Sequence, residues 1–111
     1  MSNFADINKH PEFPEGEEAL QEFLIKNTKY PKAAKEAGIQ GRVFVQFVIN
    51  KKGKVKKIKV RKGINKELDK EAKRVVSSMP DWIPAEKNGK KVKVKYIIPI
   101  NFKLNNDNTK N

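Results

Sequence analysis

The chain has 111 residues and a mass of 12.7 kDa, which is the size of one domain and leaves no room for two independent cores. Hydrophobic residues make up 37% and charged residues 34% of the chain, a balance that predicts a folded protein and excludes a disordered or collagen-like one. The absence of cysteine excludes disulfides and thiolate chemistry, and the formal net charge of +12 favours polyanionic partners.

The apolar runs are short. The longest ones, such as 43–45 and 47–49, fall far below the roughly 18 to 20 residues that a membrane-spanning helix needs, so none is expected. The first ten residues lack a basic start followed by an apolar stretch, which argues against an export signal. We therefore expect either a cytoplasmic protein or a processed piece of a longer exported one.

The amino-terminal part predicts an extended segment and two short helices. Residues 1–15 contain two prolines and no hydrophobic period, which indicates an extended lead-in with Phe13 packed on the domain. Apolar residues at helical spacing and acids at the start predict a helix over 17–27. Pro31 and Gly38 then bound a second short helix, as a proline start and a glycine stop.

A change to a period of two predicts a β-hairpin. Residues 41–49 alternate between apolar and other side chains, the segment 50–53 ends in a glycine, and a second alternating run covers 55–63. Val55 and Ile58 are three residues apart instead of two. The second strand therefore either begins after Val55 or contains a bulge.

The carboxyl-terminal half predicts one helix and one long strand. Asn65 is a plausible N-cap, Pro80 ends the helical pattern, and an apolar stripe lies between them: Leu68, Ala72, Val75, Val76 and Met79. A loop follows, in which Trp82 is expected to pack over the helix end. Unbroken alternation over 92–104 predicts the third strand, and the polar segment 105–111 predicts a flexible tail.

This order of elements indicates an α+β fold, with two short helices followed by a β-β-α-β unit. A right-handed crossover through the third helix places the first strand between the other two, in the order 2-1-3, within an antiparallel or mixed sheet packed on the helices. The third strand is then an edge, where Pro99 is tolerated. The predicted division is a lead-in over 1–15, a domain over 16–104 and a tail over 105–111.

Catalytic chemistry has little support. The single histidine, His10, lies in the lead-in, and no serine is placed to pair with it. The carboxylates gather in 12–22 and 67–71, where helix starts explain most of them, and no phosphate-binding glycine loop is present. We expect a non-enzymatic protein with no catalytic site, cofactor or metal.

Basic residues concentrate on the second strand and its turn, with a further group just before the third strand. The simplest interpretation is a solvated face whose lysines protect a sheet edge from aggregation. The functional interpretation is contact with a polyanion through Lys54, Lys56, Lys57 and Lys59. Nucleic acid is disfavoured because all but three of the 25 basic residues are lysine, and most aromatics share the core alternation.

The strand alternation places some apolar residues on the face of the sheet opposite to the core. Phe44 and Val48 on the first strand and Ile97 on the third share this second face. Together they suggest either a partly covered face or a contact with a partner.

Residues along nearly the whole chain resemble the TonB C-terminal domain family. The first half carries the Tyr-Pro, Gly-x-x-Gly and hairpin-glycine signature in Tyr30, Pro31, Ala34, Gly38, Gly41, Val43, Val45, Phe47, Ile49, Gly53, Val55, Val60 and Gly63. The second half continues it with Leu68, Asp69, Ala72, Met79, Trp82, Pro84, Gly89, Val92, Val94, Pro99, Ile100 and Phe102. The lead-in, with Phe13, Pro14, Gly16, Ala19 and Leu20, resembles Bacteroidetes-type members, so the resemblance covers 13–104.

The resemblance implies a periplasmic, non-enzymatic domain at the end of an energy transducer. Such domains bind the TonB box, a short peptide of TonB-dependent outer-membrane transporters, which adds a strand beside the last strand of the domain. The implied parent is anchored in the inner membrane with a proton-driven motor complex, or is a membrane metallopeptidase-like sensor with a similar ending. The basic surface could reflect contact with peptidoglycan.

Pro99 predicts which backbone groups meet such a peptide. Because proline has no amide proton, the backbone groups of Pro99 and of the other odd-numbered residues should face the open edge. The even-numbered residues of the third strand should then bond to the first strand. Lys93, Lys95 and Ile97 then offer free groups, and pairing stops at Pro99. A bulge before Pro99 would reverse this parity.

Two functions remain in view at this point. The leading one is binding of an extended peptide by strand addition, and the alternative is a basic polyanion-binding module for cell-wall polymer or nucleic acid. Salt distinguishes them, because contacts with phosphates weaken steeply as salt rises whereas strand pairing weakens modestly.

Overall fold

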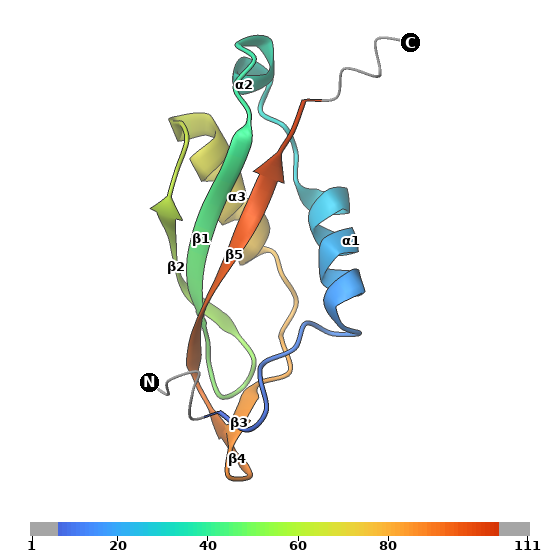
Figure 1. Cartoon of the computed structure of the whole chain (residues 1–111), viewed down its shortest axis with the longest axis vertical. Coiled ribbons are helices and arrows are strands. Elements are labelled where there is room, and N and C mark those ends of the chain that lie inside the picture. Colours follow the sequence, from blue (N-terminus) through green and yellow to red (C-terminus); the bar gives the residue numbers. More distant parts are fainter. Residues whose placement is uncertain (1–6, 105–111) are drawn as a thin grey trace.

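The structure is a computed structural model that describes residues 7–104 (Figure 1). Its elements are α1 (Glu17–Asn27), α2 (Lys32–Glu36), β1 (Gly41–Ile49), β2 (Val55–Lys62), α3 (Lys66–Ser77), β3 (Ala85–Lys87), β4 (Lys90–Val92) and β5 (Val94–Phe102). The predicted tail 105–111 and the first six residues of the predicted lead-in lie outside the described residues.

A three-stranded sheet in the order β2-β1-β5 forms the centre of the fold. β1 is antiparallel to both neighbours, which confirms the α+β class and the predicted order. The register between β1 and β5 runs without a break from the pair Gly41–Phe102 to the pair Ile49–Val94. β5 is therefore an edge strand of this sheet, as the position of Pro99 predicted.

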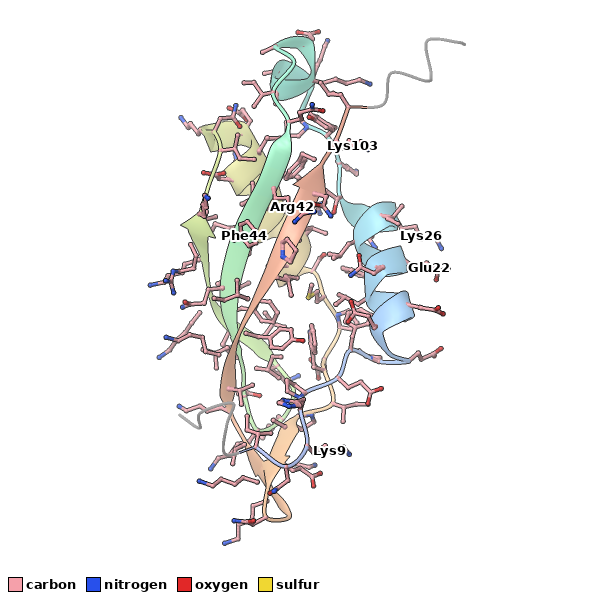
Figure 2. All side chains as sticks on the ribbon, in the orientation of Figure 1. Lys9, Glu22, Lys26, Arg42, Phe44 and Lys103 are labelled. Atoms are coloured by element: carbon pink, nitrogen blue, oxygen red, sulfur yellow. The ribbon has the colours of Figure 1, made fainter. Side chains whose placement is uncertain are left out.

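The core lies between one face of this sheet and the helices. Alternate residues of β1 are fully buried there, and the predicted stripe of α3 faces them, with Leu68, Ala72, Val75 and Val76 fully buried. Asn65 caps α3 as expected, because its side-chain oxygen accepts a hydrogen bond of 2.9 Å from the amide of Leu68. α3 crosses behind the sheet and α1 lies beside β5 (Figure 1). Figure 2 shows Arg42 and Phe44 on the face of the sheet turned away from α3.

β2 contains the bulge that its hydrophobic spacing suggested. Its register against β1 shifts between Gln46 and Val48, and Lys57 has a positive φ of 49° there. The extra residue lets both Val55 and Ile58 pack against the core, although they are three positions apart. A second shift lies between Phe44 and Val45.

The predicted third strand is not continuous from Val92. Residues 85–92 instead form a hairpin of β3 and β4, and Lys93 separates it from β5. The loop of this hairpin is Asn88-Gly89, with φ values of 51° and 79°. Asn-Gly is the strongest short signal for such a turn, so the hairpin could have been predicted from the sequence. The alternating pattern around it indicated a single strand instead.

The described part of the lead-in packs on this hairpin. The amide of Glu12 donates to the carbonyl of Ile83 at 3.0 Å, and the amide of Ile83 returns a bond of 2.7 Å. Lys9 and Glu86 exchange a similar pair at 3.1 and 2.9 Å. This backbone pairing fixes the segment to the domain.

Trp82 closes the core at this end of the molecule. It is 4% exposed, and its ring lies 5.5 Å from Phe13, 5.8 Å from Phe47 and 5.3 Å from Tyr96, measured between ring centroids. Edge-on and tilted contacts of this kind add to the energy of burial. The expected packing roles of Trp82 and Phe13 are therefore confirmed.

Candidate functional site

The free edge of β5 presents unpaired backbone groups. One side of β5 pairs with β1, and no strand within residues 7–104 pairs with the other side. Pro99 lies opposite Phe44 and has no amide to donate, so that pair cannot exchange hydrogen bonds. Because the register is unbroken, we infer from the alternation of an antiparallel ladder that the amides and carbonyls of Lys95 and Ile97 point away from β1.

Lys93 has a different position from the other predicted edge residues. It precedes β5 and belongs to neither β4 nor β5, whereas Lys95, Ile97 and Pro99 lie within β5. The side chains of all four are exposed. Lys93 can extend a ladder along this edge only if β5 lengthens by one residue.

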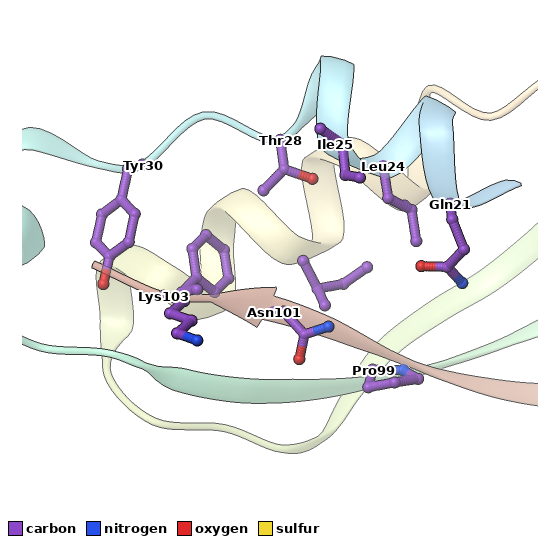
Figure 3. A pocket seen from close by; sticks show the side chains of 10 residues that line it. Gln21, Leu24, Ile25, Thr28, Tyr30, Pro99, Asn101 and Lys103 are labelled. Atoms are coloured by element: carbon purple, nitrogen blue, oxygen red, sulfur yellow. The ribbon is translucent and has the colours of Figure 1, made fainter. Parts of the chain in front are cut away.

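A groove lies between the carboxyl-terminal half of β5 and α1 (Figure 3). Its volume is about 260 Å³. The side from α1 and the following segment is formed by Gln21, Leu24, Ile25, Thr28 and Tyr30. The other side is formed by residues 99–102 of β5 and by Lys103, which follows it. The groove thus continues the free edge beyond Pro99 and places a helix alongside it.

The lining of the groove suits an extended chain with both apolar and polar groups. Ile25 is 79% exposed and is therefore available for an apolar contact. The hydroxyl Oγ1 of Thr28 is buried without a hydrogen-bond partner. Figure 3 shows Ile25, Leu24 and Gln21 on α1 facing the β5 segment that contains Pro99 and Asn101.

Glu71 and Arg74 on α3 hold the segment that leaves α1. Glu71 Oε2 accepts a hydrogen bond of 2.6 Å from the amide of Lys29, and Arg74 Nη2 donates to the carbonyl of Asn27 at 2.7 Å. The two side chains also bond to each other at 2.7 Å through both carboxylate oxygens. These four bonds position Thr28 and the wall of the groove.

The carboxylate of Glu71 is electrostatically stabilised in this position. Partial burial raises its pKa, but the hydrogen bonds from Arg74 and the Lys29 amide outweigh this and leave the pKa below its ordinary value. From the sequence, the acids of this helix were explained by their favourable interaction with the helix dipole at its amino-terminal end. The Lys29 contact spans 42 residues of sequence, and a single sequence carries no signal for it.

Tyr30 anchors the other end of the same wall. Its hydroxyl donates a hydrogen bond to the carbonyl of Ile39, and its ring meets Phe102 edge-on at a centroid distance of 5.6 Å. Burial raises the pKa of Tyr30, so the hydroxyl stays protonated and can keep donating. The Tyr-Pro pair thus connects the start of α2 to the end of the groove at Phe102.

The predicted polyanion residues do not form one group. Lys54 makes an ion pair with Asp81 at 2.9 Å beside the β1–β2 turn. Lys56 and Lys59 lie opposite Val48 and Gln46, on the face of the sheet turned away from α3. Lys57 occupies the bulge.

The apolar residues that fell out of phase share this same face. Val48 is 5% exposed, Phe44 is half-buried and Ile97 is 47% exposed. Long side chains of the flanking strands cover Val48 in the centre, while Ile97 stays open near the β5 edge.

Within residues 7–104, no cluster of His, Asp and Glu is arranged to hold a metal ion. None of the described helices is long and apolar enough to cross a membrane.

Comparison with known proteins gives one family and one fold. The family model described as "Gram-negative bacterial TonB protein C-terminal" matches residues 26–104, which includes β5 but leaves out most of α1. The NMR solution structure of Helicobacter pylori TonB-CTD, residues 179–285, is 30% identical, covers 78% of this chain and 79% of that chain, and has a TM-score of 0.52. A second NMR structure of that domain, residues 194–285, is 29% identical over 79% of this chain and 95% of that chain, with a TM-score of 0.49. No curated protein matches the chain.

Proposed function

This chain belongs to the Gram-negative bacterial TonB protein C-terminal family, and on that premise we propose that it is a non-enzymatic domain that binds the TonB box of an outer-membrane transporter. The observation that carries the proposal is the free edge of β5 beside the groove under α1. Strand addition needs such an edge, because backbone hydrogen bonds supply much of the affinity.

The peptide pairs with the outward backbone groups of Lys95 and Ile97, and with Lys93 if β5 lengthens on binding. Regular pairing stops at Pro99, which has no amide to offer. Beyond Pro99 the peptide enters the groove, where the exposed Ile25 offers an apolar contact. The edge therefore supplies affinity and the groove supplies selectivity among peptides.

The domain works in the periplasm as the end of a longer parent. In the proposed arrangement the parent is anchored in the inner membrane and coupled to a proton-driven motor complex, and strand pairing transmits its force to the transporter. A membrane metallopeptidase-like sensor with the same ending is the alternative parent. The binding edge would be the same in both.

Replacement of Ile97 by proline tests the proposal. Ile97→Pro removes the outward amide, and an edge strand tolerates proline there as it does at Pro99. We expect binding of a synthetic peptide that carries the TonB box of a transporter from the same genome to weaken at least tenfold in calorimetry. Ile97→Val, which keeps the amide, should bind as the unmodified chain does, and both variants should remain folded by circular dichroism. Unchanged binding by folded Ile97→Pro would overturn the assignment of the edge.

A further inference from the structure

The face of the sheet opposite α3, here called the open face, differs in chemistry from the rest of the surface. Alternate residues of β1 point to it, and Figure 2 shows two of them, Arg42 and Phe44, on the side of the sheet turned toward the viewer. The register adds residues of both edge strands, namely Lys56, Lys59 and Lys62 from β2 and Lys95, Ile97 and Pro99 from β5. Arg61 also lies here, because its Nη1 donates to Gln46 Oε1 at 2.6 Å.

All charges on the open face have the same sign. They are Arg42, Lys56, Lys59, Arg61, Lys62 and Lys95. The ion pairs within residues 7–104 are Lys54–Asp81 and Glu71–Arg74, and neither involves this face. Like charges on neighbouring strands repel, and a surface that only needs solvation commonly mixes the two signs.

Other surfaces of the same chain carry both positive and negative side chains, or mainly negative ones. α1 exposes Glu17, Glu18 and Glu22, and α3 interleaves acids with bases along its length. The open face is therefore positive throughout, whereas both of these helices carry acids. A face of like charges costs stability through self-repulsion, which favours a function for it.

Apolar side chains lie among these cations. Phe44 is half-buried in the middle of the face, Ile97 is 47% exposed, and Pro99 is exposed beside it. Val48 lies between Lys56 on one neighbouring strand and Lys95 on the other. The open face is thus cationic along β2 and apolar from Phe44 to the β5 edge.

We propose that the open face docks on the surface of an anionic phospholipid bilayer. Lysine-rich fringes around apolar residues are the pattern by which proteins bind a headgroup layer, with each cation strengthening binding about fivefold. Nucleic acid would call for several stacking rings and arginine forks, whereas this face has one ring, Phe44. An acidic protein would need a matching shape, whereas a fluid headgroup layer adapts to the twisted sheet.

A vesicle sedimentation experiment on the full chain tests this proposal. The probe is an equimolar mixture of phosphatidylglycerol and phosphatidylcholine, with pure phosphatidylcholine as the neutral reference. We expect binding to the anionic vesicles that weakens as salt rises. The double variant Lys56→Gln/Lys59→Gln should bind at least tenfold more weakly, because it removes cations from the open face.

A matched variant separates the open face from net charge. Lys70→Gln/Lys73→Gln removes the same charge from exposed positions of α3 and should change binding less than about threefold. Equal losses in the two double variants would overturn the proposal, as would the absence of binding at low salt. Soluble polyglutamate binding as tightly as the vesicles would also overturn it.

The apolar part of the open face gives a second readout that is independent of charge. Phe44→Trp places a fluorophore in the open face, and vesicles with brominated acyl chains should quench it. The unmodified chain, whose Trp82 is 4% exposed on the core side, should show little quenching. Equal quenching of the two proteins would place the contact elsewhere and contradict the proposed orientation.

Discussion

At the scale of single residues, Gly53 decides how the β1–β2 turn joins the core. Its φ of +84° favours glycine, and a Cβ at this position would lie 1.9 Å from the carbonyl oxygen of Trp82. The carbonyl of Gly53 also accepts a hydrogen bond of 2.7 Å from the amide of Trp82. A side chain here therefore meets rigid backbone, and the turn cannot move without losing this bond.

Gly53→Ala should lower the free energy of unfolding by about 3 to 4 kcal/mol, because the strain of a positive φ adds to the clash with Trp82. Gly38→Ala is the matched control, since Gly38 has a φ of +71° and a Cβ added there would meet nothing within 4 Å. It should cost only about 1 to 2 kcal/mol. Urea titrations of both variants give the comparison, and equal losses would show that the Trp82 contact contributes nothing.

At the scale of elements, α3 acts as a clamp on the segment between α1 and α2. Glu71 bonds to the amide of Lys29 and Arg74 to the carbonyl of Asn27, so two backbone groups at the end of α1 and just beyond it have charged partners. The side chain of Glu71 is only 11% exposed, and its hydrogen bonds are therefore weakly screened. These bonds hold the end of α1 and the segment that follows it against α3.

The stability from Glu71 should depend on pH with a defined sign. Its pKa is lowered in the folded state, so its contribution is complete above the ordinary glutamate pKa of about 4.3 and is lost as the pH falls through the lower, folded value. We expect Glu71→Gln to cost about 2 kcal/mol at pH 7 and progressively less below about pH 4.

Glu67→Gln provides the control for this change. Glu67 is exposed in the first turn of α3, where it interacts mainly with the helix dipole, so its loss should cost about 0.5 kcal/mol. Denaturant unfolding at a series of pH values measures both. A penalty for Glu71→Gln that stays constant down to pH 3 would show that its carboxylate charge is not what holds the segment.

Elements with a strong local pattern could be predicted from the sequence. α1, β1 and α3 follow from hydrophobic period and capping, and even the bulge of β2 showed in the spacing of Val55 and Ile58. The β3–β4 hairpin was missed because its alternation runs straight into that of β5, with Lys93 as the only interruption. A period of two reports extended backbone and does not report a reversal of direction.

The candidate site was predictable only in part. Pro99 indicated the edge, because a missing amide is a property of one residue type, and the parity that it implies stays a prediction. The groove was not predictable, since it depends on how α1 sits against β5 and on the contact between Glu71 and Lys29. Contacts between distant residues of this kind are absent from the local pattern of a single sequence.

At the scale of the whole molecule, the two sides of the β5 edge differ in charge. α1 exposes three acids and Lys26 on one side, the open face carries only cations on the other, and the free edge of β5 runs between them. A peptide that adds to β5 would extend the sheet without covering the open face. Peptide binding and docking to a bilayer are therefore compatible in one domain.

Amide hydrogen exchange of the chain, with and without the TonB-box peptide, tests the central claim most directly. We expect Val94, Tyr96 and Ile98 to bond to β1, so their amides should be protected before the peptide is added. The account predicts that Lys95 and Ile97 gain protection when it binds. Protection gained instead along β2, or no gain at Lys95 and Ile97 under saturating peptide, would contradict it.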